Sequence, residues 1–199
     1  HHLAPIDMSQ VEKLRNQGYH LRAVELLRQK AVSTAVFGFK DPRVAKLLPF
    51  WKEVFDLCQL NVNYVLALRH PLSVVKSLAK RDGMLAEQAY LLWLGHVIES
   101  LIGSADSKRM VLDYDRLIQS PDAELLRISK ALGLEINPVE LQSYKTQFLD
   151  QDLRHTVYKL SDLLLDNVCP PIVREVYAAL IDVASDKTTL DDKGLQNKV

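Results

Sequence analysis

An uninterrupted apolar run, Tyr64-Val65-Leu66-Ala67-Leu68, ends abruptly at Arg69, and a helical pattern begins directly afterwards at Pro71. A run of this length is typical of a strand buried on both faces of a parallel sheet. Proline is well suited to the first turn of a helix, because its missing N–H is not needed there. We therefore predict a strand that passes directly into a helix, and this junction is the basis for the rest of the interpretation.

The remaining pattern repeats this alternation. Besides 64–68, strands are predicted where β-branched and aromatic residues cluster, over 34–40 and 109–114. Helical spacing of apolar residues predicts helices over 8–32 (with a break near Gly18), 44–58, 71–82, 85–103, 122–134 and 171–183. Strands that alternate with long helices indicate an α/β fold with a mainly parallel sheet. We expect one domain over 3–184 and a polar tail over 185–199.

Composition excludes several classes of function. Lys plus Arg and Asp plus Glu both number 25, so the net charge is zero, which argues against broad binding to nucleic acid. No apolar run approaches the roughly 18 residues of a membrane span. Cys58 and Cys169 have no metal-ligand spacing, so we expect reduced thiols and no metal site. With no signal-peptide pattern at the start of the sequence, a cytoplasmic location is expected.

Polar residues follow each predicted strand: Lys40-Asp41 after the first, Arg69 after the second and Asp113 to Arg116 around the end of the third. Ligands of open α/β sheets bind at these carboxyl ends. Ser77 follows Arg69 by eight residues, about two turns into the helix. We predict that Arg69 and Ser77 hold a phosphate, because a guanidinium offers a planar fork for phosphate oxygens. The alternative is that Arg69 forms only a salt bridge with a neighbouring acid.

Taken together, several segments resemble the sulfotransferase family that uses 3′-phosphoadenosine-5′-phosphosulfate. The resemblance is closest to bacterial sulfotransferase-family proteins and more distant to tyrosylprotein sulfotransferases. Its order and spacing hold over roughly 36–135, in the segments "FGFKDPRVAKLLPFW", "YVLALRHPLSVVKSLAKRDG", "LLWLGH", "MVLDYDRLIQSP" and "ISKALGL". No single segment is decisive, and the ordered set is much more specific than any one of them.

The resemblance implies roles for individual residues. Arg69 and Ser77 would bind the 3′-phosphate of the nucleotide, and Lys40 would lie near the sulfuryl group. Arg154, in "FLDQDLRHT" (148–156), would be a further phosphate contact on a loop that closes over the nucleotide. The implied fold is a P-loop NTPase-like sandwich with a helix-rich C-terminal part. The implied reaction transfers a sulfuryl group to a hydroxyl or amine acceptor that the sequence does not identify, with no metal.

The sequence also departs from the family pattern. The family's first strand and its phosphosulfate-binding loop should precede residue 36, and nothing before that position resembles them. Pro42 stands where cytosolic members have a catalytic histidine, which leaves Asp41 as a weak candidate base and a stronger candidate for a structural cap. A non-catalytic sulfotransferase-like module therefore remains an alternative. A P-loop kinase ranks lowest, since it needs a Gly-x4-Gly-Lys-Ser/Thr loop that this sequence lacks. A sheet without that strand would expose apolar surface, through which a homodimer could form.

Overall fold

The computed structural model describes residues 6–32, 34–148 and 158–192. They belong to two compact units. One spans His1–Val62 with Gly95–Ser107, and the other spans Asn63–Leu94 with Lys108–Val199. The boundary falls within the long helix α5 (Ala86–Gly103), which contributes residues to both units.

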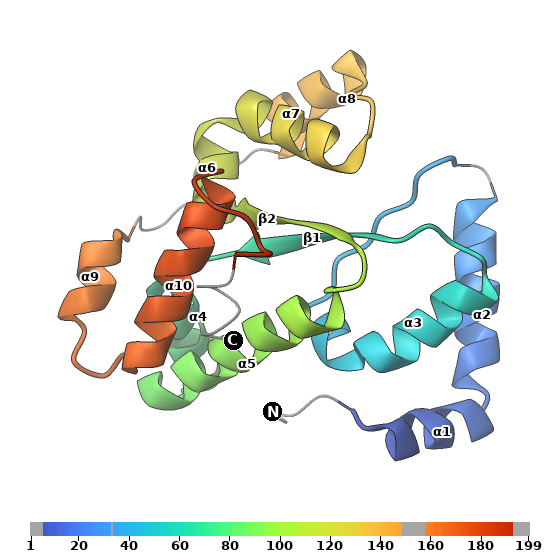
Figure 1. Cartoon of the computed structure of the whole chain (residues 1–199), viewed down its shortest axis with the longest axis horizontal. Helices are drawn as coiled ribbons and strands as arrows, with labels where there is room; N and C mark the ends of the chain where they lie inside the picture. The colour runs from blue at the N-terminus through green and yellow to red at the C-terminus, as the bar shows by residue number, and fades with distance from the viewer. Residues whose placement is uncertain (1–5, 33, 149–157, 193–199) are drawn as a thin grey trace. The chain divides into compact units, whose positions relative to one another are not determined.

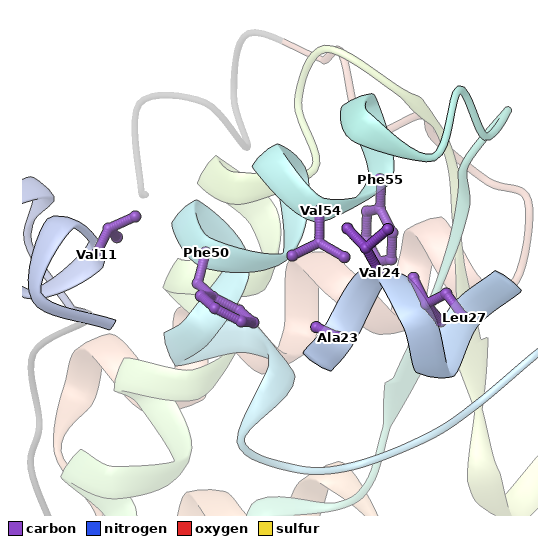
Figure 2. Close-up of a cluster of buried hydrophobic side chains, with 7 residues drawn as sticks. All are labelled: Val11, Ala23, Val24, Leu27, Phe50, Val54 and Phe55. Atoms are coloured by element: carbon purple, nitrogen blue, oxygen red, sulfur yellow. The ribbon is translucent and has the colours of Figure 1, made fainter. Parts of the chain in front are cut away.

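The first unit is helical. It contains α1 (Met8–Asn16), α2 (Tyr19–Ala31), a 3-10 turn at Val44–Leu47 and α3 (Leu48–Leu57), together with the end of α5. The predicted break at Gly18 is confirmed, because this glycine adopts a left-handed φ of 79° between α1 and α2. Seven side chains from α1, α2 and α3 form the buried core that Figure 2 shows: Val11, Ala23, Val24, Leu27, Phe50, Val54 and Phe55.

The second unit contains the sheet. Strands β1 (Asn63–Leu68) and β2 (Lys108–Asp113) run parallel, as Figure 1 shows. Asn63 lies opposite Lys108, and Leu68 lies opposite Asp113. Between them in sequence lie α4 (Pro71–Asp82) and α5, as expected for strands that need a crossover connection. The bounds predicted for α4 are confirmed: Pro71 opens the helix, and Gly83 ends it with a left-handed φ of 66°.

After β2 the described residues form helices and their connections. These are α6 (Tyr114–Gln119), α7 (Pro121–Leu132), α8 (Pro138–Ser143), a π-helical turn at Tyr144–Phe148, α9 (Leu160–Leu165) and α10 (Pro171–Ala184). Helices α7 and α10 both contact β2. The core of this unit includes side chains that are at most 2% exposed: Tyr90, Val111, Leu163, Val173, Val176 and Leu180. Of the predicted tail, Asp186 is held by an ion pair with Arg127 at 3.1 Å.

Two expectations about the sheet are corrected. The segment 34–40 is exposed and is not a strand, and residues 35–40 make no backbone hydrogen bond with another described residue. Strand β1 is not buried on both faces either, because Val65 is 40% exposed and Ala67 is exposed as well. β-Branched and aromatic composition favours an extended backbone, but only a neighbouring strand makes that backbone part of a sheet. The described sheet has two strands, so the architecture is α/β in a broad sense.

Candidate anion site at the end of β1

The sheet register determines what surrounds Arg69. Leu68, the last residue of β1, pairs with Asp113, the last residue of β2. The residues that directly follow the two strands are therefore Arg69 and Tyr114. The guanidinium carbon of Arg69 lies over the phenol ring of Tyr114, 5.1 Å from the ring centroid. This distance is within the range of a cation–π interaction. The register thus places the arginine against an aromatic face at the carboxyl end of the sheet.

The backbone of Arg69 is fixed from α5. Trp93 is 6% exposed, and its indole N–H donates a hydrogen bond to the carbonyl oxygen of Arg69 at 3.1 Å. Trp93 is therefore a core aromatic side chain. Its polar edge adds a second role, since it satisfies a carbonyl just beyond the end of the strand, where the ladder of sheet hydrogen bonds has stopped.

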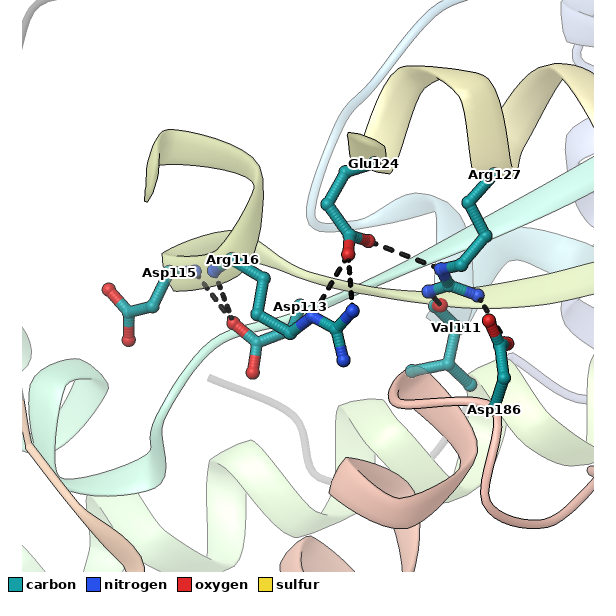
Figure 3. A network of polar contacts seen from close by, with 7 residues as sticks. All are labelled: Val111, Asp113, Asp115, Arg116, Glu124, Arg127 and Asp186. Carbon is teal, nitrogen blue, oxygen red and sulfur yellow. Dashed lines mark hydrogen bonds and ion pairs between the residues drawn. The ribbon is translucent and has the colours of Figure 1, made fainter. Parts of the chain in front are cut away.

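The side chain of Arg69 is exposed and forms no ion pair with any acid among the described residues. Other arginines near the sheet are different. Arg116 and Arg127 both bind the buried carboxylate of Glu124, at 2.8 and 3.2 Å, as Figure 3 shows. The described residues thus do not supply the salt bridge that was the alternative interpretation of Arg69. Its charge remains available to solvent or to an anionic ligand.

The N-terminus of α4 follows Arg69 directly in the sequence. His70 is the N-cap, is 1% exposed, and accepts a hydrogen bond from the Leu72 N–H through Nδ1 at 3.2 Å. Its Nε2 lies 3.2 Å from the carbonyl oxygen of Lys159, which requires Nε2 to carry the proton and donate it. Burial lowers the pKa of His70 below its ordinary value. The ring is therefore neutral and structural, and the helix presents its positive end near Arg69.

The predicted site residues are distributed over both units. Arg69 and Ser77 belong to the second unit, and both side chains are exposed, with Ser77 on the second turn of α4. Lys40 and Asp41 belong to the first unit, in the irregular segment before the 3-10 turn. Arg154 lies outside the described residues. The structure thus brings Arg69 and Ser77 into one unit, around the start of one helix.

Asp41 already has a complete set of local partners. Its carboxylate accepts hydrogen bonds from the backbone N–H of Arg43 at 2.8 Å and from the Arg43 guanidinium at 2.9 and 2.6 Å. These bonds, the side-chain ones first, hold the pKa of Asp41 far below its usual range. A carboxylate with so low a pKa is a weak proton acceptor, so the geometry favours the structural cap over the general base.

Sequence reasoning missed Tyr114 as a partner of Arg69. The segment "VLDYDR" identified Tyr114 only as part of a strand end, because the register that aligns it with Arg69 cannot be read from one sequence. Among the described residues, no group of three or more His, Cys, Asp or Glu side chains is placed to hold a metal ion. Nor is any described helix both long and apolar enough to cross a membrane.

Comparison with known proteins gives no further assignment. No family model matches the chain, and neither a curated protein nor a solved structure matches it.

Proposed function

We propose that this chain is a sulfotransferase domain that uses 3′-phosphoadenosine-5′-phosphosulfate, with Arg69 as the principal ligand of the 3′-phosphate. The single observation that supports this most is the state of Arg69: an exposed guanidinium at the carboxyl end of a parallel strand, beside a helix N-terminus, with no acid partner among the described residues. Both the position in the sheet and the helix dipole favour an anion at this end.

The proposed reaction is an in-line displacement at sulfur. The acceptor oxygen or nitrogen forms a bond to sulfur while the bond from sulfur to the bridging phosphate oxygen breaks. The acceptor releases its proton to solvent, and adenosine 3′,5′-bisphosphate leaves. Arg69 and Ser77 would hold the 3′-phosphate, Arg69 through charge-assisted hydrogen bonds and Ser77 through a neutral hydroxyl donor. Lys40 would offset the charge that develops on the leaving phosphate and the sulfuryl oxygens. The acceptor class is a hydroxyl or amine compound.

Titration calorimetry with adenosine 3′,5′-bisphosphate tests the donor site. We expect the wild-type chain to bind and Arg69→Ala to bind at least about tenfold more weakly, because charge-assisted bonds to phosphate are lost. Arg81→Ala is the matched control. Arg81 lies on the same helix but pairs with Asp82 at 2.7 Å, so its removal should leave the affinity unchanged. Equal binding by wild type and Arg69→Ala would contradict the assignment of Arg69.

Turnover distinguishes an enzyme from a binding module. In an assay of sulfuryl transfer to a simple phenol acceptor, Lys40→Ala should lower kcat by one or more orders of magnitude and leave nucleotide affinity nearly unchanged, because its charge is used mainly in the transition state. Nucleotide binding that depends on Arg69, combined with an absence of turnover across hydroxyl and amine acceptors, would instead favour the non-catalytic sulfotransferase-like module.

A further inference from the structure

We propose that Tyr114 is a positioning residue for Arg69, and that its aromatic ring, rather than its hydroxyl, keeps the guanidinium oriented for an anion. This inference rests on the proposed donor site for its functional consequence. The contact between Arg69 and Tyr114 is a property of the free protein and can be tested without a ligand.

The position of the ring is determined by the backbone on both sides. The pairing of Leu68 with Asp113 fixes the register at the end of the sheet. Asp113 is 8% exposed and caps α6 by accepting hydrogen bonds from the N–H groups of Asp115 and Arg116 at 2.7 and 3.1 Å (Figure 3). Tyr114 is the first residue of that helix, so its Cα has little freedom. The ring therefore has a fixed origin directly across from Arg69.

The guanidinium of Arg69, by contrast, has few constraints. The backbone carbonyl of Arg69 is held by Trp93, but no described carboxylate binds the Arg69 side chain. A long, exposed arginine side chain samples many rotamers, and ordering it on a ligand costs entropy. An aromatic face that already holds the guanidinium removes part of that cost before the ligand arrives. A guanidinium held against the ring in this way still has N–H groups from which an anion can accept hydrogen bonds.

This arrangement makes different predictions for the ring and the hydroxyl. Tyr114→Phe and Tyr114→Trp keep an aromatic face and should keep the affinity for adenosine 3′,5′-bisphosphate within about twofold. Tyr114→Leu removes the face and should weaken binding about two- to fivefold, the equivalent of an exposed cation–π contact. In an Arg69→Ala background, Tyr114→Leu should have no further effect, because Tyr114 acts through the arginine.

The experiment combines calorimetry on these variants with the Nε–Hε resonance of Arg69 in the free protein. We expect an upfield ring-current shift of that resonance in wild type, retained in Tyr114→Phe and lost in Tyr114→Leu, with all variants showing wild-type circular dichroism. Tyr114→Met, which also lacks an aromatic face, serves as the second variant if Tyr114→Leu does not fold.

Three results would overturn the inference: wild-type affinity in Tyr114→Leu, equal losses in Tyr114→Phe and Tyr114→Leu, or an equal loss from Tyr114→Leu with and without Arg69. If the wild-type chain binds no nucleotide, the donor site is wrong. The Nε–Hε resonance of Arg69 then tests the contact with Tyr114 by itself. A shift that depends on the aromatic ring supports the positioning role, and an unshifted resonance refutes it.

Discussion

The phenol of Tyr90 donates a hydrogen bond to Oδ2 of Asp166, with 2.7 Å between the two oxygens. Tyr90 lies on α5 and is 0% exposed, whereas Asp166 directly follows α9. The other carboxylate oxygen of Asp166 accepts a bond from the backbone N–H of Val168 at 2.9 Å. Burial acts to raise the pKa of Asp166, but the bonds from Tyr90 and the backbone outweigh it and hold the pKa below its usual value.

Tyr90→Phe should lower the free energy of unfolding at pH 7 by about 1–3 kcal/mol, because it removes a buried bond to a charged acceptor. The folded-state pKa of Asp166 is depressed, so its stabilisation is present above the ordinary value of about 3.9 and is lost as the pH falls through the folded value. The deficit of Tyr90→Phe should therefore shrink as the pH falls below about 3.9 and through the lower folded-state pKa of Asp166. Urea unfolding at each pH measures it. Tyr19→Phe, at a tyrosine that is 46% exposed, is the control and should differ little from wild type.

His70 predicts a pH dependence near neutrality. Because burial lowers its folded-state pKa, the unfolded chain binds the extra proton first as the pH falls below about 6.5. The contribution of the neutral ring to stability is complete above that pH and is lost on acidification towards the folded value. His70→Asn keeps an N-cap acceptor for α4 but cannot titrate. Denaturant unfolding from pH 8 to pH 5 should show a smaller loss of unfolding free energy in this variant than in wild type. The same dependence of unfolding free energy on pH in both proteins would contradict the role given to His70.

Glu124 is a buried carboxylate, and its side chain is 2% exposed between Arg116 and Arg127. Glu124→Gln should cost about 2–4 kcal/mol, because the buried charge that binds both guanidiniums is lost, which leaves Arg116 without its carboxylate partner and Arg127 with only its pair with Asp186. Asp122→Asn is the matched control on the first turn of the same helix. Its ion pair with Lys145 is largely exposed and should contribute less than about 1 kcal/mol. Similar losses for the two variants in thermal or urea unfolding would show that burial does not determine the difference.

Gly103, the last residue of α5, directly faces the side chain of Leu48. A methyl group at Gly103 would overlap the Cδ1 atom of Leu48, which is 4% exposed and has little room to move. Gly103→Ala should therefore destabilise the chain by about 1–3 kcal/mol, despite the higher helix propensity of alanine. Gly38→Ala meets no atom within 4 Å and should be nearly neutral.

A double variant supplies the internal check on this contact. In a Leu48→Ala background the added methyl group has space, so Gly103→Ala should cost less there than in wild type. If Gly103→Ala lowers the free energy of unfolding equally in the two backgrounds, the overlap with Leu48 is not the cause of the destabilisation.

The elements that were predicted correctly depend on local chemistry. Pro71 at the first turn and Gly83 in a left-handed cap set both ends of α4 through local chemistry, without contacts from the rest of the chain. The strand predicted over 34–40 was wrong because a strand also requires a pairing partner, and sequence composition does not show whether one is present. Arg69 was found from its position after an apolar run, but its ring partner depends on pairing between strands that are far apart in sequence.

The parallel pairing of β1 with β2 has a consequence for the order in which the chain takes shape during synthesis. Lys108 follows Asn63 by roughly 45 residues, so at about 5–20 residues per second β1 is made some two to nine seconds before β2. Helices α4 and α5 can form within microseconds in that interval. During that interval the backbone groups of β1 that later bind β2 have no strand partner, so the new chain carries an uncharged, unpaired strand edge until Lys108–Asp113 is made.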